Sequence, residues 1–89
     1  IQVTAAQAAD ELLNISGVSA SFVVFAQNGG MSFSARSMGQ LNVQLIMEKL
    51  GGGGHHTMAG AQLPGIGAEE ANQRLTAAID QYFEENSRK

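Results

Sequence analysis

The residues whose types and spacing best suit chemistry lie in one glycine-rich stretch, from Gly51 to Gly60. Its sequence is Gly-Gly-Gly-Gly-His-His-Thr-Met-Ala-Gly, with four glycines in succession. Ordering glycine costs more backbone entropy than ordering any other residue. A folded domain therefore keeps such a run where φ must be positive or where a ligand approaches the backbone closely. Exposed glycine N–H groups beside a histidine suit an anion such as a phosphate. The alternative is a flexible linker, although linkers of this kind usually contain serine.

The two histidines of this stretch are assigned different roles. Adjacent residues do not share a helix face, and no Asp, Glu or Cys stands near His55 and His56 at ligand spacing. The pattern therefore does not predict a metal site. We expect His55 to donate to a phosphate or to pack on a nucleobase, and His56 to point to solvent. Residues 55–60 are expected to form a short helical turn whose dipole adds positive potential to the glycine N–H groups.

Arg36 is the second candidate for a ligand contact. It shares a predicted strand face with Ser32 and Ser34, and no acidic residue is near it in the sequence. A guanidinium can hold two anionic oxygens at once, which favours a phosphate or base contact. Ser34 and Ser37 would then be supporting hydroxyl groups, although a structural role explains each of them better than a ligand contact. An ordinary surface arginine is the alternative interpretation, and the sequence leaves both open.

The composition limits the classes of protein. The chain has 89 residues, 44% of them hydrophobic and 15% charged, which indicates one small globular domain. It contains no cysteine, so it has neither a disulfide framework nor a thiolate metal site. The net charge of −3 argues against binding a long duplex through a broad basic surface. Because Lys49, His55 and His56 gather near the glycine run, a compact anionic ligand fits the charge distribution better.

The periodicity of the apolar residues predicts three helices and three strands. The helices are expected over residues 4–14, 42–50 and 68–86, and the strands over 19–27, 31–37 and 61–63. Asn28-Gly29-Gly30 is a hairpin signal, Asn42 is a plausible helix N-cap, and Gly51 is the residue expected to end that helix. The fold class is therefore α+β (mixed α/β), in the order helix, strand, strand, helix, strand, helix. Its helices pack on a small sheet that contains one antiparallel hairpin.

Apolar stripes on two of these helices predict which side chains face the core. The stripe of the middle helix contains Val43, Ile46, Met47 and Leu50, and that of the closing helix contains Ala71, Leu75, Ala78, Ile79, Tyr82 and Phe83. Thr4 and Gln7 are placed as a capping box at the start of the first helix. The opening residues Ile1-Gln2-Val3 are typical of the end of a strand, so we expect a fragment of a longer protein.

Residues 51–63 resemble the glycine-rich GGGH motif of the DHH-associated C-terminal domain of DHH-family phosphoesterases. Ser34-Ala35-Arg36-Ser37 is similar to the family's Ser-x-Arg-Ser strand end, and residues 42–51 are similar to its helix before the glycine loop. Residues 8–13 and 20–22 resemble the membrane-anchored cyclic-di-AMP phosphodiesterase branch (GdpP-type). Gly60 departs from the family, which usually has the second Ala of a pair there; both residues are small.

The resemblance implies that catalysis and substrate binding belong to two different domains. In these enzymes a catalytic domain holds two manganese ions through Asp and His, and the C-terminal domain holds the substrate across a cleft. Carried onto this chain, the substrate contacts would be Arg36, Gly52, Gly53, Gly54 and His55, with Ser37 and Thr57 beside them. The chain has no Asp-His-His motif. Residues 1–89 are therefore expected to be one substrate-binding domain that has no cofactor of its own, binds weakly and does not catalyse.

The function that the resemblance implies is hydrolysis of cyclic-di-AMP to pApA by the full-length enzyme, a protein anchored in a bacterial cell membrane with this domain in the cytoplasm. One alternative is the same domain from an oligoribonuclease or pAp phosphatase. An alternative of another class is a non-catalytic module that binds a nucleotide or single-stranded nucleic acid, although the chain lacks a basic groove with interleaved aromatic residues. The expected partners are a cyclic dinucleotide or short oligonucleotide and the missing catalytic domain. The choice between a monomer and a homodimer stays open.

Overall fold

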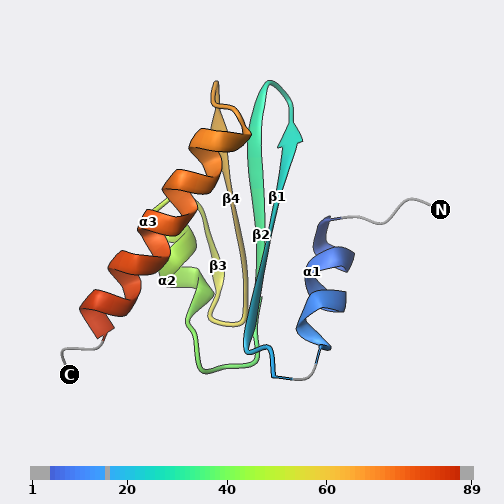
Figure 1. The fold of residues 1–89 in the computed structure, drawn as a ribbon, viewed down its shortest axis with the longest axis vertical. Helices are drawn as coiled ribbons and strands as arrows, with labels where there is room; N and C mark the ends of the chain where they lie inside the picture. The colour runs from blue at the N-terminus through green and yellow to red at the C-terminus, as the bar shows by residue number, and fades with distance from the viewer. Residues whose placement is uncertain (1–4, 16, 87–89) are drawn as a thin grey trace.

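One antiparallel sheet separates two helical layers (Figure 1). The computed structural model describes residues 5–15 and 17–86. Within them, the sheet has the strand order β1-β2-β4-β3, with β1 at Ala20–Gln27, β2 at Gly30–Ser37, β3 at Gly53–His55 and β4 at Met58–Pro64. The helix α1 (Ala5–Leu13) lies against β1 and β2 on one face, and α2 (Val43–Glu48) and α3 (Ala68–Asn86) cover the other. The predicted α+β class and element order are confirmed, with β3 as an additional strand.

The hairpin between β1 and β2 closes through the predicted tight turn. Gln27 pairs with Gly30, so the turn contains only Asn28 and Gly29. Both turn residues have positive φ, 51° for Asn28 and 77° for Gly29, as a type I′ turn requires. The turn fixes the register of β1 against β2, and thereby decides which side chains share each face of the sheet.

The hydrophobic core lies between the sheet and the layer formed by α2 and α3. It contains Met31, Phe33, Ala35, Val43, Ile46, Met47, Leu50, Ala59, Ala61, Ala71, Leu75, Ala78 and Tyr82. The predicted stripe of α2 is confirmed. In α3 the stripe is confirmed except at Phe83, which is 48% exposed, so its predicted place in the core is wrong. Successive helix residues point about 100° apart, and Tyr82 occupies the buried position while the Phe83 ring meets the Tyr82 ring edge-on.

The start of α2 is capped as its sequence predicts. The Asn42 side chain accepts a hydrogen bond from the backbone N–H of Leu45 at 3.3 Å. The Asn42 backbone N–H itself donates to the Tyr82 hydroxyl at 3.0 Å, so the buried tyrosine of α3 also holds this cap in place.

Gly51 ends α2, as predicted. Its φ is +83°, and its N–H donates to Glu48 O at 3.0 Å. The next N–H, of Gly52, reaches back to Met47 O at 2.9 Å. These two bonds are the Schellman pattern, in which a glycine of positive φ satisfies the last carbonyls of a helix.

The segment after Gly51 differs from its prediction. The helical turn expected over residues 55–60 is wrong, because β3 and β4 form a hairpin there, with Gly53 opposite Gly60 and His55 opposite Met58. Strand β4 accordingly starts at Met58, before the predicted strand at 61–63. A Cβ on Gly54 would lie 2.6 Å from Met58 O, so β3 lies too close to β4 for a side chain at this position. The glycine therefore permits the hairpin.

Two further expectations concern the ends of the described chain. Thr4 lies outside the described residues, so the predicted capping box stays a prediction. Among the described helices, none is both long enough and apolar enough to cross a membrane.

Candidate functional site

The register of the sheet brings two of the predicted ligand contacts, Arg36 and His55, onto one face. Arg36 of β2 pairs with Met58 of β4, and Met58 pairs with His55 of β3, so the three residues form one row across three strands. Neighbouring strands lie about 4.8 Å apart, which separates Arg36 from His55 by roughly 10 Å along the row. The row lies on the face opposite α2 and α3, since Phe33 and Ala35 at alternate positions of β2 belong to the core. We call this row, with its flanking residues Ser34 and Gly60, the polar face.

Arg36 is buried and already has partners. It is 8% exposed, and its Nε donates to Asp10 Oδ1 of α1 at 2.8 Å. Its Nη1 donates to the backbone oxygen of Ala35 at 2.9 Å. The interpretation as an ordinary surface arginine is therefore wrong. No partner of Nη2 is found among the described residues.

Ser37 has a structural role. It is 5% exposed, and its hydroxyl donates to Leu41 O at 2.7 Å and accepts from Gly39 N at 2.9 Å. These bonds hold the loop between β2 and α2. Its predicted contact with a ligand stays a prediction that would require one of these bonds to be shared. Ser34 is half-buried on the polar face and is the better placed of the two hydroxyls.

The tip of the β3–β4 hairpin is fixed to the loop that follows β2. Thr57 O accepts from Ser37 N at 3.0 Å, and His56 O accepts from Val43 N at 3.0 Å. The His56 ring is exposed, as expected, and its Nε2 lies 3.0 Å from Gly39 O. His55 is also exposed, at the end of β3. The hairpin tip thus presents His55 from a backbone that is held on two sides.

The four glycines, residues 51–54, have different structural roles. Gly51 ends α2, and a Cβ on Gly52 would lie 2.1 Å from Gly60 O, so Gly52 is required for packing against β4. Gly54 has φ +143°, and a Cβ there would lie 2.6 Å from Met58 O. At Gly53, as at Gly51, a Cβ would meet nothing within 4 Å. The proposed anion contacts would come from β3, the edge strand, whose outer edge lacks a strand partner among the described residues, and not from a helix start.

An open hollow of about 580 Å³ adjoins the polar face at Ser34 and Gly60. It is lined by Phe25, Gln27, Ser32, Phe33, Ser34, Gly51, Gly52, Gly60, Ala61 and Gln62. The Ser32 hydroxyl donates to Gln27 Oε1 at 2.9 Å, which places a small polar network beside the Phe25 ring. Aromatic and amide groups of this kind suit a nucleobase. Sequence reasoning missed Phe25 and Gln62, although each occupies an outward-facing position of its strand in the pattern of period two.

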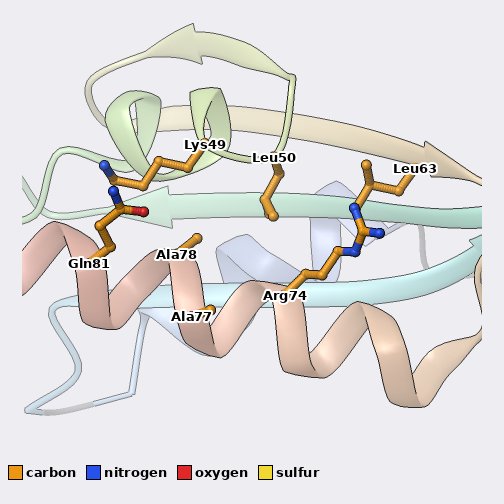
Figure 2. A pocket seen from close by; sticks show the side chains of 7 residues that line it. All are labelled: Lys49, Leu50, Leu63, Arg74, Ala77, Ala78 and Gln81. Carbon is orange, nitrogen blue, oxygen red and sulfur yellow. The ribbon is translucent and has the colours of Figure 1, made fainter.

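The opposite layer carries a second pocket, of about 290 Å³, between α3, the end of α2 and β4 (Figure 2). Its apolar floor is bounded by two cationic side chains, Lys49 and Arg74. Lys49 Nζ lies 2.7 Å from Glu85 Oε1, and Arg74 Nη2 lies 2.6 Å from Glu70 Oε2. Because a carboxylate neutralises each cation, this pocket attracts an anion less than its two cations would suggest.

The donors that a metal ion needs are not gathered in the part of the chain that the structure describes. Among the described residues, no three His, Cys, Asp or Glu side chains come together. The residues present therefore do not fit a manganese site.

The chain is thus a small α+β domain with the polar face on one side of its sheet. The model of the DHHA1 domain family matches residues 2–85, and the chain belongs to this family.

Several relatives in this family are phosphodiesterases. Over 84 residues the chain is 56% identical to the cyclic-di-AMP phosphodiesterase GdpP of Geobacillus thermodenitrificans, covering 93% of this chain and 13% of the relative. Over 82 residues it is 52% identical to the cyclic-di-AMP phosphodiesterase PdeA of Listeria monocytogenes, covering 91% and 12%. The bifunctional oligoribonuclease and PAP phosphatase NrnA of Thermus thermophilus is 44% identical over 50 residues, covering 56% and 15%. The chain thus spans a small part of the length of each.

A solved structure has a similar fold. The pGpG-specific phosphodiesterase PggH of Vibrio cholerae matches with a TM-score of 0.54 at 25% identity, covering 72% of this chain and 23% of the other.

Proposed function

We propose that this chain is the substrate-binding domain of a phosphodiesterase that hydrolyses cyclic-di-AMP to pApA. The observation that carries the proposal is the row of Arg36, Met58 and His55 on the polar face of the sheet. In that row a guanidinium and an imidazole are separated by an exposed apolar side chain, with Met58 at 51% exposure. A nucleotide has matching parts, since its phosphate is anionic and its base is flat and largely apolar on its faces. The identity of 56% with GdpP supports cyclic-di-AMP as the ligand.

In this proposal the hydrolytic chemistry takes place in another domain. Manganese ions held by that domain would supply it, and the residues described here would bind and orient the nucleotide. Arg36 would donate to a phosphate oxygen through Nη2, for which the described residues offer no partner, and His55 would donate to a phosphate or pack on a base. We further propose that the parent protein is anchored in a membrane, with this domain on the cytoplasmic side.

A titration of the chain with three ligands tests the proposal. Cyclic-di-AMP, pApA and a short RNA are each added to ¹⁵N-labelled protein, and the shifted amide signals are followed by NMR, which detects weak binding. We expect cyclic-di-AMP to bind more tightly than RNA and to shift residues of β3, β4 and the end of β2. Shifts confined to the second pocket, between Lys49 and Arg74, would contradict the assignment of the polar face. The absence of any shift would contradict a nucleotide-binding role.

The relative NrnA favours a second candidate, in which the same face serves an oligoribonuclease or pAp phosphatase. The two candidates differ in what the parent enzyme turns over. Hydrolysis of short RNA or pAp without hydrolysis of cyclic-di-AMP would support the second. Binding of any single-stranded nucleic acid, with no hydrolysis by the parent protein, would instead support a non-catalytic module.

A further inference from the structure

We infer that Asp10 is a positioning residue for Arg36, holding the guanidinium so that its open edge stays available to a ligand phosphate. The inference rests on the proposed function, because it assigns Asp10 a role in a binding site that includes Arg36. It adds to that site a carboxylate from α1, a helix that contributes none of the predicted contacts.

The contact belongs to a double attachment between α1 and the sheet. Two successive helix residues, Ala9 and Asp10, each accept a hydrogen bond from a strand. The Ser21 hydroxyl donates to Ala9 O at 2.6 Å, and Arg36 Nε donates to Asp10 Oδ1 at 2.8 Å. Ser21 and Arg36 are directly opposite each other in the β1–β2 register. The helix is therefore attached to the sheet at the cross-strand pair where the row of the polar face begins.

The hydrogen bonds of Arg36 fix the whole guanidinium. The group is planar, so fixing two of its nitrogens determines the position of the third. Asp10 fixes Nε and the Ala35 carbonyl fixes Nη1, which leaves the N–H groups of Nη2 in a defined place with no partner found among the described residues. A free arginine loses much side-chain freedom when it binds a ligand, whereas an arginine held in advance loses little.

The negative charge of Asp10 repels an anionic ligand, whereas its hydrogen bond holds Arg36 in position for that ligand. The balance between repulsion and positioning decides whether loss of Asp10 strengthens or weakens binding. The Asp10 side chain is 61% exposed, so water and salt screen most of its repulsion. The Arg36 side chain is 10% exposed, and without Asp10 its Nε would lose its only acceptor among the described residues. We therefore expect positioning to outweigh repulsion, so that loss of Asp10 weakens ligand binding.

Ser21 provides a control for the alternative that Asp10 only holds α1 on the sheet. The substitution Ser21→Ala removes the neighbouring attachment of the same helix and leaves Arg36 and its partners untouched. If attachment of α1 were all that mattered, the substitutions Ser21→Ala and Asp10→Ala would weaken binding alike. If Asp10 positions Arg36, only Asp10→Ala would do so.

The experiment compares Asp10→Ala, Asp10→Asn and Ser21→Ala, each with Arg36 present and in an Arg36→Ala background. Affinity for cyclic-di-AMP is measured by NMR titration, and folding is checked by the amide spectrum. We expect Asp10→Ala to weaken binding by about fivefold, Asp10→Asn to restore part of it through its amide oxygen, and Ser21→Ala to change it by less than about twofold. In the Arg36→Ala background we expect Asp10→Ala to change affinity by less than about twofold.

A second measurement tests, in the absence of ligand, whether Asp10 holds the Arg36 side chain in place. The Arg36 Nε–H signal should be visible in the unaltered chain and in Asp10→Asn, and should broaden or vanish in Asp10→Ala. Unchanged or tighter binding by Asp10→Ala, or equal weakening by Ser21→Ala, would overturn the inference. If Asp10→Ala fails to fold, Asp10→Asn and the Nε–H signal decide. Normal binding by Arg36→Ala would instead show that the proposed function places the ligand wrongly.

Discussion

The two faces of the sheet use the same strands for different purposes. On the face toward α2 and α3, alternate residues such as Phe33 and Ala35 are buried in the core. On the polar face, the residues between them, Ser34 and Arg36, lie in rows with the β3–β4 hairpin. Because successive strand residues point to opposite faces, neighbours in sequence should respond oppositely to mutation. Substitutions on the first face should cost stability, and those on the second should cost ligand binding.

The largest expected effect tests this contrast with two adjacent residues. The substitution Phe33→Ala removes a ring that is 3% exposed and should lower the free energy of unfolding by about 3–4 kcal/mol. The matched substitution Ser34→Ala, on the polar face, should change it by less than about 1 kcal/mol. Urea denaturation followed by circular dichroism measures both. Similar losses at the two positions would show that both faces are equally part of the core.

A pair of glycines sharpens the contrast within the glycine run. A Cβ on Gly52 would lie 2.1 Å from Gly60 O, so Gly52→Ala should destabilise the fold by about 1–3 kcal/mol. At Gly53 a Cβ meets nothing within 4 Å, so Gly53→Ala should leave the midpoint of urea denaturation nearly unchanged. If a ligand approaches β3 closely, Gly53→Ala should nevertheless weaken its binding. Normal binding by a stable Gly53→Ala protein would remove Gly53 from the proposed site.

His55 gives a clean test of the polar face, since its side chain is exposed. We expect His55→Ala to weaken binding of cyclic-di-AMP by about fivefold, with a change in unfolding free energy below about 0.5 kcal/mol. His56→Ala is the matched control, because its ring contacts the Gly39 carbonyl and is expected to contribute nothing to the ligand. Equal weakening by both variants would indicate a general effect of the hairpin tip. The same measurement on Arg36→Ala should show weaker binding together with some loss of stability, since Arg36 is buried and paired.

The sequence predicts those parts of the fold that depend on near neighbours. The Asn28-Gly29 turn, the Asn42 cap and the end of α2 at Gly51 each depend on backbone contacts within a few residues, and each is confirmed. The contact of Arg36 with Asp10 joins residues 26 positions apart, so no local pattern could reveal it. Strand β3 was missed for a related reason. Its glycines are explained by their distance from β4, which depends on the tertiary fold.

The site follows the same division between local pattern and tertiary contact. The place of His55 on the polar face was not predictable, because it depends on β3. The residue types and the strand face that Arg36 shares with Ser34 were predictable, since strand periodicity sets that face. It was not predictable which donor and acceptor atoms of each side chain are already used in hydrogen bonds within the fold. Arg36 has one guanidinium nitrogen with no partner in the part of the chain that the structure describes, whereas the Ser37 hydroxyl is hydrogen-bonded within its own loop. Tertiary packing decides which hydrogen-bonding atoms of a polar side chain remain available to a ligand.

The smallest expected effect concerns the helical layer, where charge contributes little. The hydrogen bond from Lys49 lowers the pKa of the Glu85 carboxyl below its usual value. A carboxyl whose folded pKa is lowered stabilises the fold above its unfolded pKa, and this contribution is lost as pH falls through the folded pKa. The substitution Glu85→Gln should therefore slightly reduce stability at pH 7 and make no difference at pH 2. Because Glu85 is exposed, the difference in urea midpoint should be small and should shrink further in high salt. A large loss at pH 7 would mean that the link between α2 and α3 depends on this ion pair and not on the buried side chains beneath it.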